Sequence, residues 1–137
     1  MTTIKFSYKT SDFDTSGYLY DNDIYFTDIV TFPLYNNFTD LKIIGRGLLV
    51  DNVLNTNTNG VVNEIGSYFI DNLENINGYD IFGYIYSFRN STSFFVPGQI
   101  INIPIVFGTS IDNGKTGSVT INVIDDILRI VTIVIND

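Results

Sequence analysis

The alternation of apolar and polar residues over short segments constrains this chain more than any other feature of its sequence. Residues 3–9 read TIKFSYK and residues 117–124 read GSVTINVI, with every second residue apolar. A period of two residues places the apolar side chains on one face of an extended chain, which is typical of a half-buried β-strand. Both segments are therefore predicted to be strands.

Other segments are apolar on both faces, as expected of strands that are covered on both sides. They are residues 79–88, 100–107 and 127–135. Further strands are predicted over residues 23–32, 41–50 and 61–71. Turn-forming residues lie between the apolar runs, namely Asn59-Gly60, Asn77-Gly78 and Asp112-Asn113-Gly114.

The composition favours the same class of fold. The chain has no alanine, the strongest helix former, and 21 isoleucines, which favour strands. No helical period of useful length is present, and 137 residues fit one domain with a real core. The predicted fold class is all-β, with residues 1–137 forming a single antiparallel barrel of about eight strands.

Two missing residue types exclude several kinds of chemistry. Without cysteine the chain has no disulfide, no thiolate nucleophile and no cysteine-based zinc site. Without histidine it lacks the commonest general base and every serine–histidine or cysteine–histidine nucleophile. Asp125 and Asp126 are adjacent in a predicted turn, so they do not form a pair for glycoside hydrolysis. No catalytic residue is predicted.

The net charge of −8 bears on partners and location. A nucleic-acid binder normally carries a basic face, so no nucleic acid is expected, and the same charge disfavours anionic membranes. The first residues lack the apolar run of a secretory signal, and no apolar stretch is long enough for a spanning helix. We therefore expect the protein in the cytoplasm or in a virus particle, since the residue usage suits an AT-rich genome.

Several segments from Asp28 onward resemble the allene oxide cyclase and dirigent β-barrel superfamily in their order and spacing. Residues 28–53 are similar to that family's apolar strand, Leu-Tyr turn and glycine-containing strand. Residues 101–123 are similar to its Pro-Ile-x-Gly-Gly-Thr-Gly signature, and residues 60–70, 79–88 and 127–135 to its other strands. The resemblance implies a barrel and, as in that family, a homotrimer.

The residues that carry the family's reactions are not matched. Phe107-Gly108 stands where the signature has paired glycines, and Ser110 stands at its later glycine. Lys9 or Thr10 stands about where the cyclases have a glutamate, and Leu49 about where they have a cysteine. The resemblance thus implies a fold and an assembly but no reaction.

Residues 12–23 have nearly the spelling of a twelve-residue calcium loop. Calcium takes six to eight oxygen ligands, and such a loop supplies them at alternate positions around a glycine at the sixth place, here Gly17. The predicted metal ligands are Asp12, Asp14, Ser16, Tyr18 and Asp23. The alternative, which we prefer, is a solvated hairpin loop, because Asp, Ser and Gly also form turns.

Two other features suggest a small-molecule site. Aromatic residues crowd one region and could line a barrel mouth, although packing is the simpler explanation; they are Tyr79, Phe82, Tyr84, Tyr86, Phe88, Phe94 and Phe95. Arg46 and Arg89, on predicted strands, could each anchor an anionic ligand or pair with one of the many acidic residues. No ligand is identified by these residues.

The leading hypothesis is a non-catalytic barrel that serves as a structural or interaction module in a homo-oligomeric assembly, viral or other. The alternative is a barrel that binds a small apolar ligand or confines a reactive one, because confinement needs few catalytic groups. An eight-stranded outer-membrane barrel has a similar length, but the missing signal and the resemblance to soluble barrels disfavour it.

Overall fold

The structure is a computed structural model that describes residues 1–21, 25–36, 42–56, 59–71, 79–89, 96–108 and 114–136. Its strands are β1 (Thr2–Lys9), β2 (Asp14–Asp21), β3 (Tyr25–Tyr35), β4 (Ile43–Thr56), β5 (Asn59–Asp71), β6 (Tyr79–Arg89), β7 (Ile100–Gly108), β8 (Thr116–Val123) and β9 (Leu128–Asn136). The all-β prediction is confirmed. Within the described ranges the one helix is the 3-10 turn η1 (Thr10–Asp12), and no helix could span a membrane.

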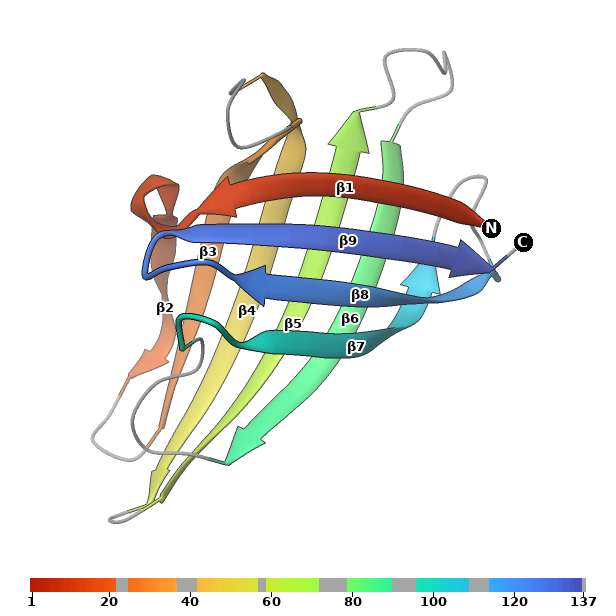
Figure 1. Ribbon diagram of the computed structural model, residues 1–137. Helices are drawn as coiled ribbons and strands as arrows, with labels where there is room; N and C mark the ends of the chain where they lie inside the picture. Colours follow the sequence, from red (N-terminus) through yellow and green to blue (C-terminus); the bar gives the residue numbers. More distant parts are fainter. Residues whose placement is uncertain are drawn as a thin grey trace.

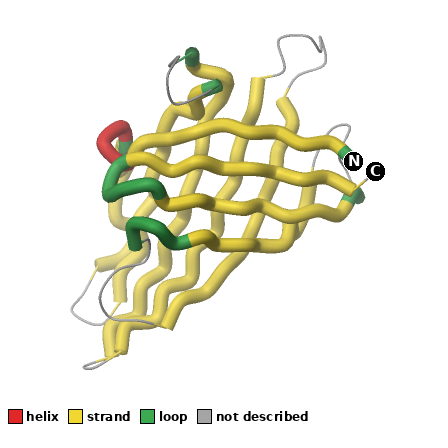
Figure 2. The backbone as a smooth tube through the Cα atoms, viewed as in Figure 1, coloured by secondary structure: helices red, strands yellow, loops and turns green. Residues whose placement is uncertain are grey.

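All nine strands belong to one antiparallel sheet with the order β1-β9-β8-β7-β6-β5-β4-β3-β2. The sheet curls so that β1, β9, β8 and β7 form one wall while β3 to β6 form the opposite wall (Figure 1). A further pairing between Ser7 of β1 and Tyr35 of β3 joins the two walls and closes the barrel at that end. Strands dominate the backbone of the described residues, and the loops described lie at the ends of the strands (Figure 2).

Residues 14–21 were not predicted to be a strand, and here the hairpin-loop interpretation is wrong. They form β2, which pairs with residues 26–31 of β3, so the calcium-loop spelling falls mostly on extended chain. Two extra residues, Ser16 and Leu19, interrupt the pairing as bulges. Bulges bend and twist a strand, which makes the outer edge of β2 a poor template for pairing with another chain.

The turn signals had mixed outcomes. Asn59 and Gly60 were predicted to form a turn, but both lie in β5, where they pair with Thr56 and Asn55 of β4. The long ladder between β4 and β5 sets this register, because a shift of one residue would move each apolar side chain to the other face. Gly114 does occupy a turn, with φ of 80°, a conformation that glycine adopts without steric cost. Asn77-Gly78 lies outside the described residues.

The interior of the described barrel is filled by side chains that alternate along the strands, as the period of two predicts. The buried core cluster is Phe6, Tyr8, Val30, Phe32, Leu34, Leu49, Tyr68, Ile70, Ile103, Val119, Ile121, Val131, Ile133 and Ile135. Aromatic rings pack against one another in this cluster and beside it: the Phe32 ring lies 4.6 Å from that of Tyr8 and 5.0 Å from that of the partly buried Phe13, between ring centres. This part of the barrel is a packed core and not a channel.

Gly47 makes room for one of these rings. A Cβ atom at Gly47 would lie 2.2 Å from the Phe32 ring, well inside van der Waals contact. The space that a side chain at Gly47 of β4 would fill is therefore taken by the Phe32 ring of the neighbouring strand β3. Arg46 and Leu48, on either side of Gly47, point to the outer face of the barrel.

Candidate functional site

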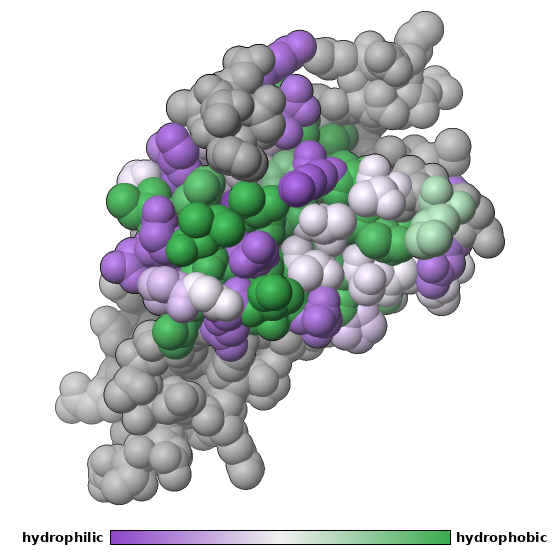
Figure 3. All heavy atoms as spheres, viewed as in Figure 1, coloured by the Kyte–Doolittle hydropathy of each residue, from purple (hydrophilic) through white to green (hydrophobic). Residues whose placement is uncertain are grey.

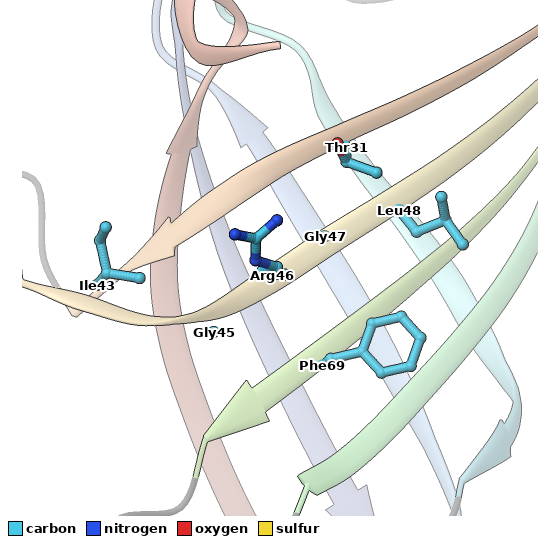
Figure 4. Close-up of a pocket in the computed structure, with 7 residues that line it drawn as sticks. All are labelled: Thr31, Ile43, Gly45, Arg46, Gly47, Leu48 and Phe69. Carbon is cyan, nitrogen blue, oxygen red and sulfur yellow. The ribbon is translucent and has the colours of Figure 1, made fainter. Parts of the chain in front are cut away.

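The outer face of β3, β4 and β5 carries a hollow of about 380 Å³. Its lining residues are Thr31, Ile43, Gly45, Arg46, Gly47, Leu48 and Phe69 (Figure 4). We call this site the Arg46 hollow. It lies outside the barrel because Arg46 and Ile43 are exposed, whereas the alternate positions along the same strands are buried.

The strand register explains which side chains meet in the Arg46 hollow. Arg46 pairs with Phe69 on β5, and Leu48 pairs with Thr31 on β3. Opposite residues in an antiparallel pair have neighbouring side chains on the same face. Arg46 and Leu48 lie two residues apart on this face, and the backbone of Gly45 and Gly47 completes the lining between these side chains. The result is an apolar depression with one guanidinium group in it.

A second hollow of about 320 Å³ adjoins the first and has the opposite character. It shares Thr31, Ile43 and Arg46 with the Arg46 hollow but is also lined by Asp12 and Asp14. We call it the acidic hollow. Arg46 thus lies between an apolar surface and two carboxylates. Among the described residues no ion pair holds the Arg46 guanidinium, so the group is available to a partner.

The Asp12 carboxylate has a partner of its own at the barrel seam. The Tyr35 hydroxyl donates a hydrogen bond of 2.7 Å to Asp12 Oδ2. The Lys9 ammonium lies 5.9 Å from the centre of the Tyr35 ring, within cation–π range. The hydrogen bond to Asp12, together with burial, raises the pKa of the Tyr35 phenol above its ordinary value. These contacts join η1 and β1 to the end of β3.

The Tyr35–Asp12 hydrogen bond predicts a loss of stability at alkaline pH. A group whose pKa is raised on folding stabilises the fold fully below its unfolded pKa, which is about 10 for tyrosine. That stabilisation is lost as the pH rises through the higher folded value. The difference in unfolding free energy between wild type and Tyr35→Phe should therefore be constant from pH 7 to 9 and shrink above about pH 10.

Urea denaturation followed by circular dichroism at a series of pH values measures this difference. Because the other tyrosines titrate in both proteins, their contribution cancels in the comparison. A difference that does not change up to pH 11 would show that the phenolic proton contributes nothing to the seam.

The predicted calcium ligands are distributed over different elements. Asp12 ends η1 and Asp14 begins β2, and both line the acidic hollow. Ser16 and Tyr18 lie in β2, where the backbone is a bulged strand. Asp23 lies outside the described residues. Arg46 shares the acidic hollow, and its positive charge opposes a cation there. Calcium binding by these residues remains a prediction.

The predicted aromatic and arginine sites lie largely outside the part that can be described. Tyr79, Phe82, Tyr84, Tyr86, Phe88 and Arg89 are in β6, but only the course of that strand is described, and Phe94 and Phe95 lie outside the described residues. Of the two strand arginines, Arg46 is placed, and it lies on an outer surface and not at a barrel mouth.

A second surface feature is the tight turn between β8 and β9, which we call the hairpin tip (residues 124–127). The Asp125 carboxylate accepts hydrogen bonds from the backbone N–H groups of Leu128, at 2.7 Å, and Ile127, at 2.8 Å. These bonds, with a smaller contribution from Arg129, hold the pKa of Asp125 below its ordinary value. Asp125 therefore stabilises its own turn, and the turn predicted at Asp125 and Asp126 is present.

The hairpin tip is also tied to η1. Thr10 donates two hydrogen bonds to it, both of 2.9 Å, from its backbone N–H to the Ile127 carbonyl and from Oγ1 to the Asp126 carbonyl. The side chains of Ile124 and Ile127 nevertheless remain 43% and 48% exposed. Hydrophobic surface gathers over this end of the barrel (Figure 3).

Sequence reasoning missed Arg129, which is buried inside the barrel. Its guanidinium donates hydrogen bonds to the backbone carbonyls of Asp125 and Leu128 and so closes the barrel beneath the hairpin tip. In the sequence, Arg129 shares a face with Val131, Ile133 and Ile135, but the opposite face is nearly as apolar, so the spacing did not show that this face lies inside. The role is structural, because the arginine supports the turn and faces neither hollow.

Comparison of the sequence with models of known protein families, and with curated protein sequences, finds no match.

Proposed function

We propose that this protein is a non-catalytic β-barrel that acts as a structural or interaction module in a homo-oligomeric assembly. The observation that carries the proposal is the contrast between the two faces of the β3–β5 wall. The inner face packs into a filled core, whereas the outer face presents half-buried Leu48 and Phe69 beside exposed Ile43 and Arg46. No element of the described chain packs over this outer face.

An exposed apolar depression that contains one arginine has the chemistry of a protein contact. Aromatic residues and arginine are enriched where protein interfaces are buried, whereas lysine and the acidic residues are depleted there. The resemblance to the allene oxide cyclase and dirigent superfamily supports a homotrimer in particular. A place in the cytoplasm or in a virus particle is part of the same proposal.

The alternative is a small apolar ligand, and the size of the Arg46 hollow favours keeping it. Small-molecule pockets have volumes of about 300–1,000 Å³ and an apolar lining with a few polar groups. At about 380 Å³ with Arg46 in its wall, the hollow is within that range. The ligand would lie against the outer wall of the barrel, not inside it.

Native mass spectrometry of protein purified without detergent tests the proposal. We expect a bare trimer whose mass does not change when calcium is added. A co-purified small molecule would support the ligand alternative, and one calcium per chain would establish residues 12–23 as a metal site. A monomer at every concentration would contradict the proposed assembly.

A further inference from the structure

We propose that the hairpin tip of one copy of this protein docks into the Arg46 hollow of a second copy, with Asp126 facing Arg46. The inference rests on the proposed self-association and names the two surfaces that form the contact. Each surface exposes large apolar side chains next to one unpaired charge, and the two charges are opposite.

The hairpin tip has the composition of a ligand for that hollow. Ile124 and Ile127 are 43% and 48% exposed in a turn, where polar residues are more usual. The Asp125 carboxylate accepts hydrogen bonds from the backbone of its own turn. The Asp126 carboxylate, by contrast, has no hydrogen-bonding partner in the described part of the chain and is exposed. The tip thus offers two isoleucines and one available carboxylate.

The Arg46 hollow has the matching composition. Ile43, 60% exposed, together with Leu48 and Phe69 provides the apolar surface, and Arg46 provides the only charge in the lining. A guanidinium group binds a carboxylate through two parallel N–H donors, which fixes orientation as well as charge. Apolar surface on each side of this pair excludes water and strengthens the attraction.

The rigidity of both surfaces favours the contact. The tip is held by the Asp125 hydrogen bonds and by Thr10, and the hollow is built on paired strands. Docking therefore orders few groups, which reduces the entropy cost of association. Asp12 and Asp14 line only the acidic hollow, so an incoming carboxylate is directed to the apolar side of Arg46.

The contact joins two different surfaces, so it is heterologous. Heterologous contacts close into a ring when the rotation between copies permits it, and the trimer proposed above is one such ring. The same contact would make an open chain if the rotation did not close. In either assembly each copy uses both its tip and its hollow.

A charge exchange tests this docking. Arg46→Glu and Asp126→Arg each place like charges in the contact, and each is expected to raise the dissociation constant about a hundredfold, because like charges cost several kcal/mol in an interface. The double variant reverses the pair and should associate close to the wild-type affinity. Sedimentation velocity over a range of protein concentrations measures all three proteins and the wild type.

Lys5→Glu is the matched control. It makes the same change in net charge as Arg46→Glu at an exposed position of β1, away from both surfaces, and should leave association unchanged. Near-ultraviolet circular dichroism and the melting temperature of each variant show whether it folds. Because Arg46 and Asp126 are exposed, both single variants are expected to melt close to the wild type.

Other outcomes overturn the docking model in distinguishable ways. Association that neither single variant weakens would place the interface elsewhere and leave the proposed assembly intact. Weakening without rescue in the double variant would show that the two surfaces do not meet. If a small anion co-purifies with the wild type but not with Arg46→Glu, and association is unchanged, the Arg46 hollow would be assigned to a ligand. Wild type that stays monomeric would remove the proposed assembly together with the docking.

Discussion

Replacing Phe32 with alanine is expected to lower the free energy of unfolding by about 3–5 kcal/mol. The ring is almost fully buried and lies against those of Tyr8 and Phe13. It also fills the space that Gly47 leaves on the neighbouring strand. Truncation would open a cavity between two strands of a closed sheet, where the backbone cannot collapse easily. Urea denaturation followed by circular dichroism measures the change.

Gly47→Ala provides the internal control, because it probes the same space from the other strand. In the wild type the added methyl group meets the Phe32 ring, and such overpacking costs about 1–3 kcal/mol. In the Phe32→Ala background the ring is absent, so the same methyl group should cost much less. Equal costs in the two backgrounds would mean that Gly47 and Phe32 do not share this space.

Replacing Ile133 with alanine is expected to lower the free energy of unfolding by about 2–5 kcal/mol. Ile133 lies in the middle of β9, fully buried inside the barrel, and pairs with Ile4 of β1 and Val119 of β8. Loss of its side chain removes apolar contacts on the inner face of three adjacent strands. Chemical denaturation of the purified variant measures the effect.

Ile130→Ala is the matched control for this prediction. It is the same substitution on the same strand, but Ile130 is on the outer face and only half buried. The expected cost is about 1 kcal/mol, typical of a substitution outside a packed core. A reversed order of the two costs would mean that β9 presents its other face to the barrel interior.

Much of the fold was predictable because strand formation leaves a local signal. The segment TIKFSYK alternates strictly, so its apolar face is evident from the sequence, and β1 has that face in the core. The strand β2 gave no such signal. Its large side chains are the consecutive Tyr18, Leu19 and Tyr20, which do not alternate with polar residues. Its pairing with β3 is also interrupted at Ser16 and Leu19, so its extended form depends on the long neighbouring strand.

The candidate site was predictable only in its parts. The sequence singled out Arg46 as a strand arginine, and Asp12 and Asp14 as ligands of a calcium loop. That these residues line adjoining hollows follows from pairing between β2, β3 and β4, which no short segment encodes. The apolar neighbour Phe69 comes from β5, in register with Arg46 across the ladder. Such long-range neighbours are set by the register of the sheet.

In the segment ILRIVTIVI, the sequence determined that a strand forms, and the tertiary structure decided which face of that strand points into the barrel. Its length, its β-branched residues and its lack of proline were enough to make residues 127–135 a strand. Its two faces are nearly equal in hydrophobicity, one containing Arg129 and the other Thr132, so alternation alone could not choose between them. The tertiary structure places the face with Arg129 inward, because at the barrel end the guanidinium reaches the carbonyls of Asp125 and Leu128 and stays hydrogen-bonded while buried.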